Sequence, residues 1–324
     1  MGAVSGEHVA WVLNLDADLE LAAGKEYAPS KGVLGAMAQH VAKLARSLVG
    51  PDDVVLAGDT SRLGVGAAAL RGRAFCPTPR AIALMRRHGV EPEVHPAFEV
   101  LRRVNGRGFC AELGQTLAGA VFVVSVEEAA RTVAALPPIG RQWRAKRAYG
   151  MAGRGQRPIA PGALSGADRR FIAASIERDG GLQIEPEVAI VRELTVHGML
   201  AADGTLRLGR VVEQRCDASG QWRESAPLDA EGPEDILVPS LGDLGDLGDE
   251  ARRVASALHA AGYFGPFGVD AFEHRDGDRI VLNPRSEINA RYSMGFPASG
   301  LLAGRASVAA RAQDAPIAPP VQRP

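Results

Sequence analysis

The sequence predicts an α/β domain followed by α+β lobes. In residues 8–104, short apolar runs rich in strand formers alternate with segments of helical periodicity, which is typical of a mostly parallel sheet. From Val188 to Cys216 the pattern becomes antiparallel, with Asp203-Gly204 as a hairpin turn. A chain of 324 residues is also long enough for two or three compact units.

The N-terminal segment begins with a predicted strand in residues 8–15. A helix is predicted over residues 31–49, where apolar side chains recur at helical spacing until Gly50-Pro51. A second strand (54–57), a glycine-rich stretch and a helix (79–88) follow. Asn14 and Asp16 end the first strand, where parallel sheets tend to hold ligands, although capping of a helix explains them equally well.

The middle of the chain predicts a short helix at 111–118 and a strand at 120–124. Ser125 with Glu128 forms a capping-box pattern that opens a helix reaching residue 136. A strand (141–148), a glycine-rich loop (150–155), a helix (165–179) and a strand (182–185) follow.

The C-terminal part adds a loop at 239–248 and a helix at 249–261, with Gly262 suited to its left-handed cap. Strands at 267–273 and 279–283 are joined by a turn. These signals divide the chain into residues 1–104, 105–182 and 183–310, with a disordered tail at 311–324.

Composition excludes several classes of protein. The net charge of -1 gives no general attraction to nucleic acid or to an anionic membrane. The three cysteines are far apart and form no zinc or disulfide pattern. Neither a signal peptide nor an apolar run of the roughly 18 residues needed to span a membrane is present. We therefore expect a cytoplasmic enzyme or binding protein.

The segment from Arg279 to Arg291 is the most informative. If it is extended, Arg285, Glu287, Asn289 and Arg291 lie on one face, because successive side chains of a strand point to opposite faces. Glu287, Asn289 and Asp270 on the partner strand offer the oxygen ligands that magnesium prefers. A solvated face crossed by ordinary salt bridges is the alternative interpretation.

The stretches Gly268-Val-Asp270 and Ser286-Glu287-Ile-Asn289 resemble the metal-binding strands of the ATP-grasp superfamily, including D-alanine–D-alanine ligases and amino-acid ligases. The resemblance implies an ATP-grasp fold with an N-terminal α/β domain that precedes it. It further implies that Asp270, Glu287 and Asn289 bind Mg²⁺, with Mn²⁺ as an alternative, and that ATP is the nucleotide.

The same resemblance extends to the phosphate-binding residues. Arg107 stands where the family places a Lys or Arg that reaches phosphate, and Lys146 matches the lysine before the phosphate-covering loop. Arg144 and Arg147 are neighbours with which Lys146 could be confused. Gly153 and Gly155 match the glycine loop, in which the backbone approaches phosphate closely.

The hinge and the catalytic arginines complete the resemblance. Glu185, Glu187 and Val188 match the hinge that pairs with adenine, and Glu193 matches the residue that holds the ribose. Many D-alanine ligases carry an Arg where this chain has Gly268. Arg285 and Arg291 are therefore the candidates to supply the equivalent positive charge in this chain. His197 is a candidate acid or base. Because a histidine in such a position is more often structural, we do not count it among the catalytic residues.

The predicted function is a ligase that joins a carboxylate to an amine through an acylphosphate, with release of ADP and phosphate. The substrates are small molecules, such as an amino acid or a peptide. The alternatives are an ATP-grasp kinase and a nucleotide-binding subunit without turnover. A homodimer is expected by analogy with relatives.

Overall fold

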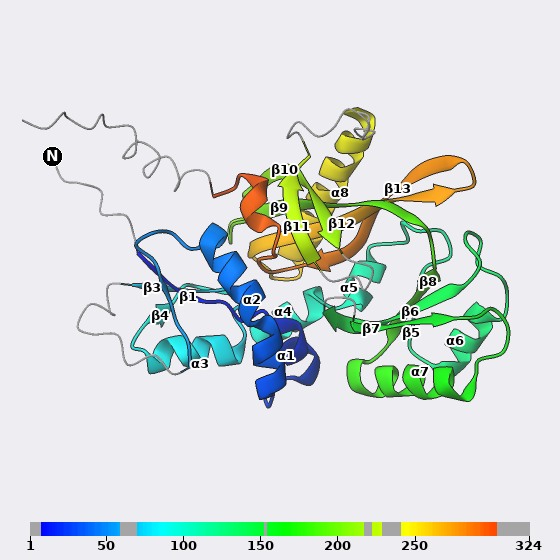
Figure 1. Cartoon of the computed structure of the whole chain (residues 1–324), viewed down its shortest axis with the longest axis horizontal. Helices are drawn as coiled ribbons and strands as arrows, with labels where there is room; N and C mark the ends of the chain where they lie inside the picture. The colour runs from blue at the N-terminus through cyan, green and yellow to red at the C-terminus, as the bar shows by residue number, and fades with distance from the viewer. Residues whose placement is uncertain (1–7, 59–69, 152–153, 217–221, 229–240, 303–324) are drawn as a thin grey trace, which may run out of the picture.

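The computed structural model describes residues 8–58, 70–151, 154–216, 222–228 and 241–302. These residues form three sheets in three lobes, which follow one another along the chain (Figure 1). The predicted combination of a parallel α/β lobe with antiparallel α+β lobes is confirmed. The predicted tail at 311–324 lies outside the described residues.

The first sheet is parallel and has the strand order β2-β1-β3-β4. Its central strand, β1, is buried along its whole length, as expected for a strand with helices on both faces. Its strands are β1 (Val9–Val12), β2 (Val54–Val55), β3 (Arg71–Ala74) and β4 (Glu91–Pro92), and the helices of this part are α1 (Ala17–Ala23), α2 (Lys31–Leu48), α3 (Pro79–Arg87), α4 (Phe98–Val104) and α5 (Arg107–Glu112).

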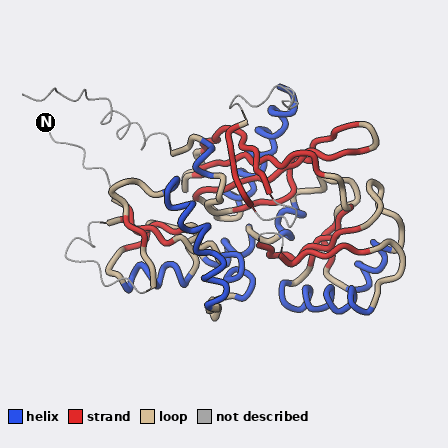
Figure 2. Tube along the Cα trace, viewed as in Figure 1, coloured by secondary structure: helices blue, strands red, loops and turns tan. Residues whose placement is uncertain are grey.

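The second sheet is antiparallel, in the order β5-β8-β6-β7. Helices α6 and α7 cover the face that lies away from the third sheet (Figure 2). Ser165 and Asp168 form a full capping box at the start of α7. The elements are β5 (Val121–Val123), α6 (Val126–Val133), β6 (Trp143–Met151), β7 (Arg154–Ile159), α7 (Gly166–Asp179) and β8 (Leu182–Pro186).

The third sheet is antiparallel, in the order β11-β10-β9-β12-β13. Its apolar side chains share one core with α8 and with residues of the first lobe, such as Trp11 and Leu101. The elements are β9 (Ile190–Leu200), β10 (Leu206–Cys216), β11 (Trp222–Pro227), α8 (Leu241–Ala260), β12 (Gly265–Asp276), β13 (Arg279–Asn289) and the short 3₁₀ helix η2 (Phe296–Ser299).

Three predicted elements were wrong. The helix expected at 111–118 is α5, which starts at Arg107 and ends before Gly114, a residue with φ +92°. The loop expected at 239–248 is helical from Leu241 onward, because this extra length buries Leu247 in the core. The glycine-rich stretch at 150–155 is mostly strand, since β6 extends to Met151 and β7 resumes at Arg154.

The described helices include none that is long and apolar enough to cross a membrane.

Candidate functional site

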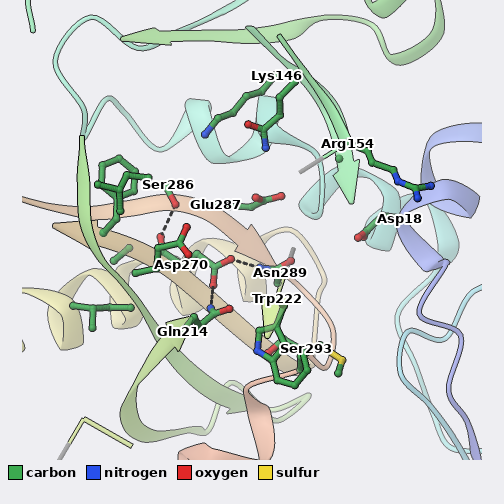
Figure 3. A pocket seen from close by; sticks show the side chains of 18 of the residues that line it. Asp18, Lys146, Arg154, Gln214, Trp222, Asp270, Ser286, Glu287, Asn289 and Ser293 are labelled. Atoms are coloured by element: carbon green, nitrogen blue, oxygen red, sulfur yellow. Dashed lines mark hydrogen bonds between the residues drawn. The ribbon is translucent and has the colours of Figure 1, made fainter. Parts of the chain in front are cut away.

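A cavity of about 1030 Å³ is lined by residues of all three lobes, with strand residues from the second and third sheets. The second sheet contributes Lys146 and the third contributes Asp270, while helices α1 and α2 form the wall on the side of the first lobe. Figure 3 shows acidic, basic and amide side chains converging on this space.

The hairpin of β12 and β13 supplies the acidic centre. Asp270 and Glu287 are directly opposed in the register, so both side chains lie on the same face. Asn289 follows two residues after Glu287, and its Nδ2 donates to Asp270 Oδ2 at 2.8 Å. The structure therefore brings together the three residues predicted to bind metal (Figure 3).

Neutral donors on the neighbouring strands fix the Asp270 carboxylate. Thr195 Oγ1 donates to Asp270 Oδ1 at 2.7 Å and Gln214 Nε2 donates to the same oxygen at 3.1 Å. Burial, and then the charge of Glu287, raise the pKa of Asp270 to about 6. The sequence does not reveal Thr195 and Gln214 as partners of Asp270, because only the pairing of β12 with β9 and of β9 with β10 brings them to this position.

The donor set fits magnesium. The described residues contain no cluster of three or more His, Cys, Asp or Glu side chains placed to hold a metal. Two carboxylates and an amide oxygen nevertheless match an ion that usually takes one or two carboxylates and completes its shell with substrate phosphate and water. The Asp270 and Glu287 carboxylates, side by side, also leave negative charge that a cation would neutralise.

Arg107 joins this acidic centre from α5. Its Nη2 lies 2.7 Å from Glu287 Oε2, while its side chain is only 5% exposed. Its Nε and Nη1 have no hydrogen-bond partner among the described residues. Burial alone would lower the pKa of Arg107, but the carboxylates of Glu287 and Glu185 raise it, so the guanidinium stays charged and can accept another anion.

The second sheet provides a further pair of cations. Arg144 and Lys146 both line the cavity, and they form ion pairs with Glu187 and Glu185 respectively. Arg147, the other candidate, lies instead over the ring of Phe171 at 5.3 Å. The pairing of β6 with β8 explains this arrangement, because it sets the basic strand beside the acidic one.

The predicted hinge residues Glu185, Glu187 and Val188 line the cavity, as does Glu193 on β9. Glu187 and Val188 lie in the connection between Pro186 and Ile190, where the chain passes from the second sheet to the third, while Glu185 lies near the end of β8. Gly153 lies outside the described residues. Gly155 has φ +78° and packs on Arg147 rather than lining the cavity.

The predicted catalytic role of Arg285 must be corrected, because the structure places its side chain outside the cavity. Its guanidinium is 1% exposed and bonds Glu250 and the carbonyl oxygen of Gly114. The physical reason is a bulge: the register shifts between Asp270 and Phe272, so that residues 284–286 of β13 lie opposite the single residue Ala271 of β12. Ser286 lines the cavity in its place, with its Oγ 3.2 Å from the carbonyl oxygen of Asp270.

Arg291, by contrast, lines the cavity and holds Asp18 through Nε at 3.0 Å and Nη2 at 2.7 Å. Burial alone would lower the pKa of Arg291, but Asp18 raises it. Asp18 is a cavity residue that the sequence did not reveal. Asn14 and Asp16 do not line the cavity, since Asn14 bonds Cys76 and Thr78 while Asp16 bonds Arg80.

Packing explains two further positions, His197 and Gly268. His197 is fully buried, its Nε2 lies 2.7 Å from Ser293 Oγ, and burial lowers its pKa to about 3. It is therefore a structural residue. A Cβ on Gly268 would lie 3.3 Å from atoms of both His197 and Thr195, so an arginine is not accommodated there without movement.

No protein-family model matches the chain, and no curated protein does. Solved structures do match. The D-alanyl-alanine synthetase A of Vibrio cholerae is 13% identical with a TM-score of 0.50, over 89% of this chain and 90% of that one. The biotin carboxylase of Campylobacter jejuni is 12% identical with a TM-score of 0.53, over 91% of this chain and 68% of that one.

A third match is the biotin carboxylase domain of the 2-oxoglutarate carboxylase of Hydrogenobacter thermophilus, in complex with MgADP, ADP and bicarbonate. It is 12% identical with a TM-score of 0.52, over 90% of this chain and 66% of that one. At these identities the likeness is one of fold.

Proposed function

The chain has the ATP-grasp fold, and on this premise we propose that it is an ATP- and magnesium-dependent ligase that joins a carboxylate to an amine. The single observation that carries the proposal is the meeting of Asp270, Glu287 and Asn289 in a cavity that Lys146 and Arg107 also line. Two carboxylates and an amide opposite two cations suit a magnesium nucleotide.

The nucleotide would lie across the junction of the second and third sheets. The chain segment at Glu185, Glu187 and Val188 offers backbone groups to the adenine edge, and Glu193 offers a carboxylate to the ribose. Lys146 and Arg107 would contact the phosphates, after exchanging their present carboxylate partners for phosphate oxygens.

Asp270, Glu287 and Asn289 would hold Mg²⁺, which when bound neutralises the charge on the transferring phosphoryl group. The role of the strands is to keep these oxygens in place. Thr195 and Gln214 serve that role through their bonds to Asp270.

The reaction we propose has two steps. A carboxylate oxygen of the acid attacks the γ-phosphorus of ATP, which forms an acylphosphate and releases ADP. The amine nitrogen then attacks the acyl carbon, the C–O bond to phosphate breaks, and the amine loses a proton. Arg291, held by Asp18 at the edge of the cavity, would orient the acid, while Arg107 and Lys146 would stabilise the phosphoryl charge.

The test is release of ADP by the full chain with MgATP and a panel of acids and amines. We expect ADP formation to need both an acid and an amine, and Glu287→Gln to abolish it. A stable phosphorylated product without amine would identify a kinase instead. ATP binding without ADP formation would identify a nucleotide-binding subunit, and AMP as the product would contradict the mechanism.

A further inference from the structure

Part of the cavity wall consists of side chains to which the proposed nucleotide and metal sites assign no role. These side chains are mostly aromatic or thioether and come from helix α2, the residue after β3, strand β11 and the segment after β13: Met37, His40, Phe75, Trp222 and Met294. We refer to these residues as the apolar end. The whole cavity of about 1030 Å³ lies at the upper limit of the roughly 300–1,000 Å³ typical of ligand sites.

Trp222 is fixed in place at this end. Its Nε1 donates to Ser225 Oγ at 2.8 Å, and the Lys43 ammonium lies over its ring, 4.3 Å from the centroid. The same ammonium donates to the carbonyl oxygen of Arg223 at 2.5 Å, which ties α2 to β11. The indole therefore lines the cavity in a defined orientation, and it can pack against a flat ligand without losing further conformational freedom.

Two methionines and the His40 ring belong to the same apolar end. Met37 comes from α2 and Met294 follows β13, and the His40 ring centroid lies 6.3 Å from that of Trp222. Thioethers adapt to the shape of an apolar ligand and pack well against aromatic rings. A charged or very small ligand would leave these apolar groups without a partner.

Arg291 links the apolar end to the reacting centre. Arg291 already donates three hydrogen bonds: two go to Asp18, and one goes from Nη1 to the carbonyl oxygen of Tyr292 at 3.1 Å. A guanidinium has five N–H groups, so it retains donors for a ligand carboxylate. Its Cζ lies 5.4 Å from the centroid of Phe75, and Met294 follows it closely along the chain.

We infer that the acid used by this chain carries an aromatic or large apolar group, with its carboxylate at Arg291 and its side group against Trp222, Met37 and Met294. This inference rests on the proposed ligase function, whose acid it specifies. It excludes very small acids, such as acetate or bicarbonate, as the preferred substrate.

The experiment varies the acid alone. Hydroxylamine replaces the amine, so that any acylphosphate is trapped as a hydroxamate while ADP is released. The panel comprises 3-phenylpropanoate and phenylalanine, set against acetate, bicarbonate, alanine and glutamate. The inference predicts kcat/KM at least about tenfold higher for the aromatic acids, since even one methylene group in an apolar site changes this ratio by about 10- to 200-fold.

Variants of the wall provide the second part of the test. Trp222→Ala and Met37→Ala are each expected to lower kcat/KM for the aromatic acid about tenfold or more, while KM for ATP changes little. Leu34→Ala is the matched control, because Leu34 lies on the same helix, is 50% exposed and does not line the cavity. Equal losses for all acids, or no loss, would overturn the inference.

Binding provides a measurement that does not depend on turnover. The chain has three tryptophans, and Trp11 and Trp143 are only 0% and 4% exposed, so quenching by a ligand in the cavity should come from Trp222. Saturable quenching by 3-phenylpropanoate, lost in Trp222→Phe, supports the inference even if no ADP forms, in which case only the ligase proposal fails. Faster ADP release with the small acids would refute the inference and leave the ligase proposal intact.

Discussion

Arg107 and Glu287 are 180 residues apart in the sequence, yet Arg107 Nη2 lies 2.7 Å from Glu287 Oε2. Both residues line the cavity. In the proposed reaction this carboxylate must bind magnesium and the guanidinium must bind phosphate. Each of the two residues would therefore exchange its partner in the ion pair for metal or phosphate.

Removing the guanidinium should tighten metal binding in the absence of nucleotide. In Arg107→Ala we expect the Kd for Mn²⁺ to fall about tenfold, which corresponds to about 1.4 kcal/mol of binding free energy, because the competing cation next to Glu287 is lost. Electron paramagnetic resonance of the free ion measures this Kd. Nucleotide affinity should fall in the same variant. Arg103→Ala serves as control, since its ion pair with Glu112 is exposed. An unchanged Kd for Mn²⁺ would show that the pair does not compete with metal.

The neutral donors around Asp270 should matter for metal affinity. In Gln214→Leu and Thr195→Val, Asp270 loses one of the bonds that fix its carboxylate, so the magnesium concentration needed for half-maximal ADP formation should rise about 10- to 100-fold. Arg207→Gln, at an exposed position on the same strand as Gln214, should have no effect. If saturating magnesium fails to restore turnover, the two residues act in another way.

Lys146 should contribute to ATP binding as a point charge. Because hydrogen bonds to charged groups contribute about 1.5–3 kcal/mol, Lys146→Gln should raise KM for ATP about 10- to 100-fold. Steady-state kinetics with varied ATP measures this. Arg178→Gln, on the same lobe and 44% exposed, should keep the KM of the parent protein. An unchanged KM for Lys146→Gln would remove this residue from the phosphate site.

Arg285 should stabilise the fold rather than take part in the reaction. Its guanidinium is buried between Glu250 and Gly114, so Arg285→Met leaves the Glu250 carboxylate without one partner and should lower the free energy of unfolding by about 3–5 kcal/mol. Urea denaturation measures this loss, and Arg279→Met, 78% exposed on the same strand, is the control. A large loss of kcat with unchanged stability would restore the catalytic role.

His197 should make the protein less stable in acid. Its pKa falls from 6.5 to about 3 on folding, because of burial. The unfolded state therefore binds the proton first, and stability is lost as pH falls from about 6.5 towards 3, by about 1.4 kcal/mol per pH unit at most. The free energy of unfolding at pH 7, 6 and 5 should depend less on pH in His197→Gln. An identical dependence in both proteins would mean that His197 is protonated in the fold.

The sequence alone determined the reacting hairpin and most of the fold class. A strand has a period of two, and a turn at residues 276–278 pairs the strand that carries Asp270 with the strand that carries Glu287, so this pairing could be anticipated from local pattern. The register could not, because the pairing that runs from Asp276 and Arg279 to Phe272 and Asn283 would oppose Asp270 to Arg285, and the bulge shifts the partner to Glu287. The helix caps are likewise local. Ser125 accepts from the Glu128 N–H, although the Glu128 carboxylate accepts from Val124 rather than completing the predicted capping box, and Ser165 forms a full box with Asp168.

Tertiary structure decided the rest. A bulge turned Arg285 away from Glu287, although strict alternation puts them on one face. Local alternation carries no information about the two extra residues that β13 has opposite Ala271. Only contacts between distant segments brought Asp18, Gln214 and Trp222 to the cavity and Thr195 to Asp270. Such contacts depend on how whole lobes pack, and a single sequence does not record that packing in any short pattern.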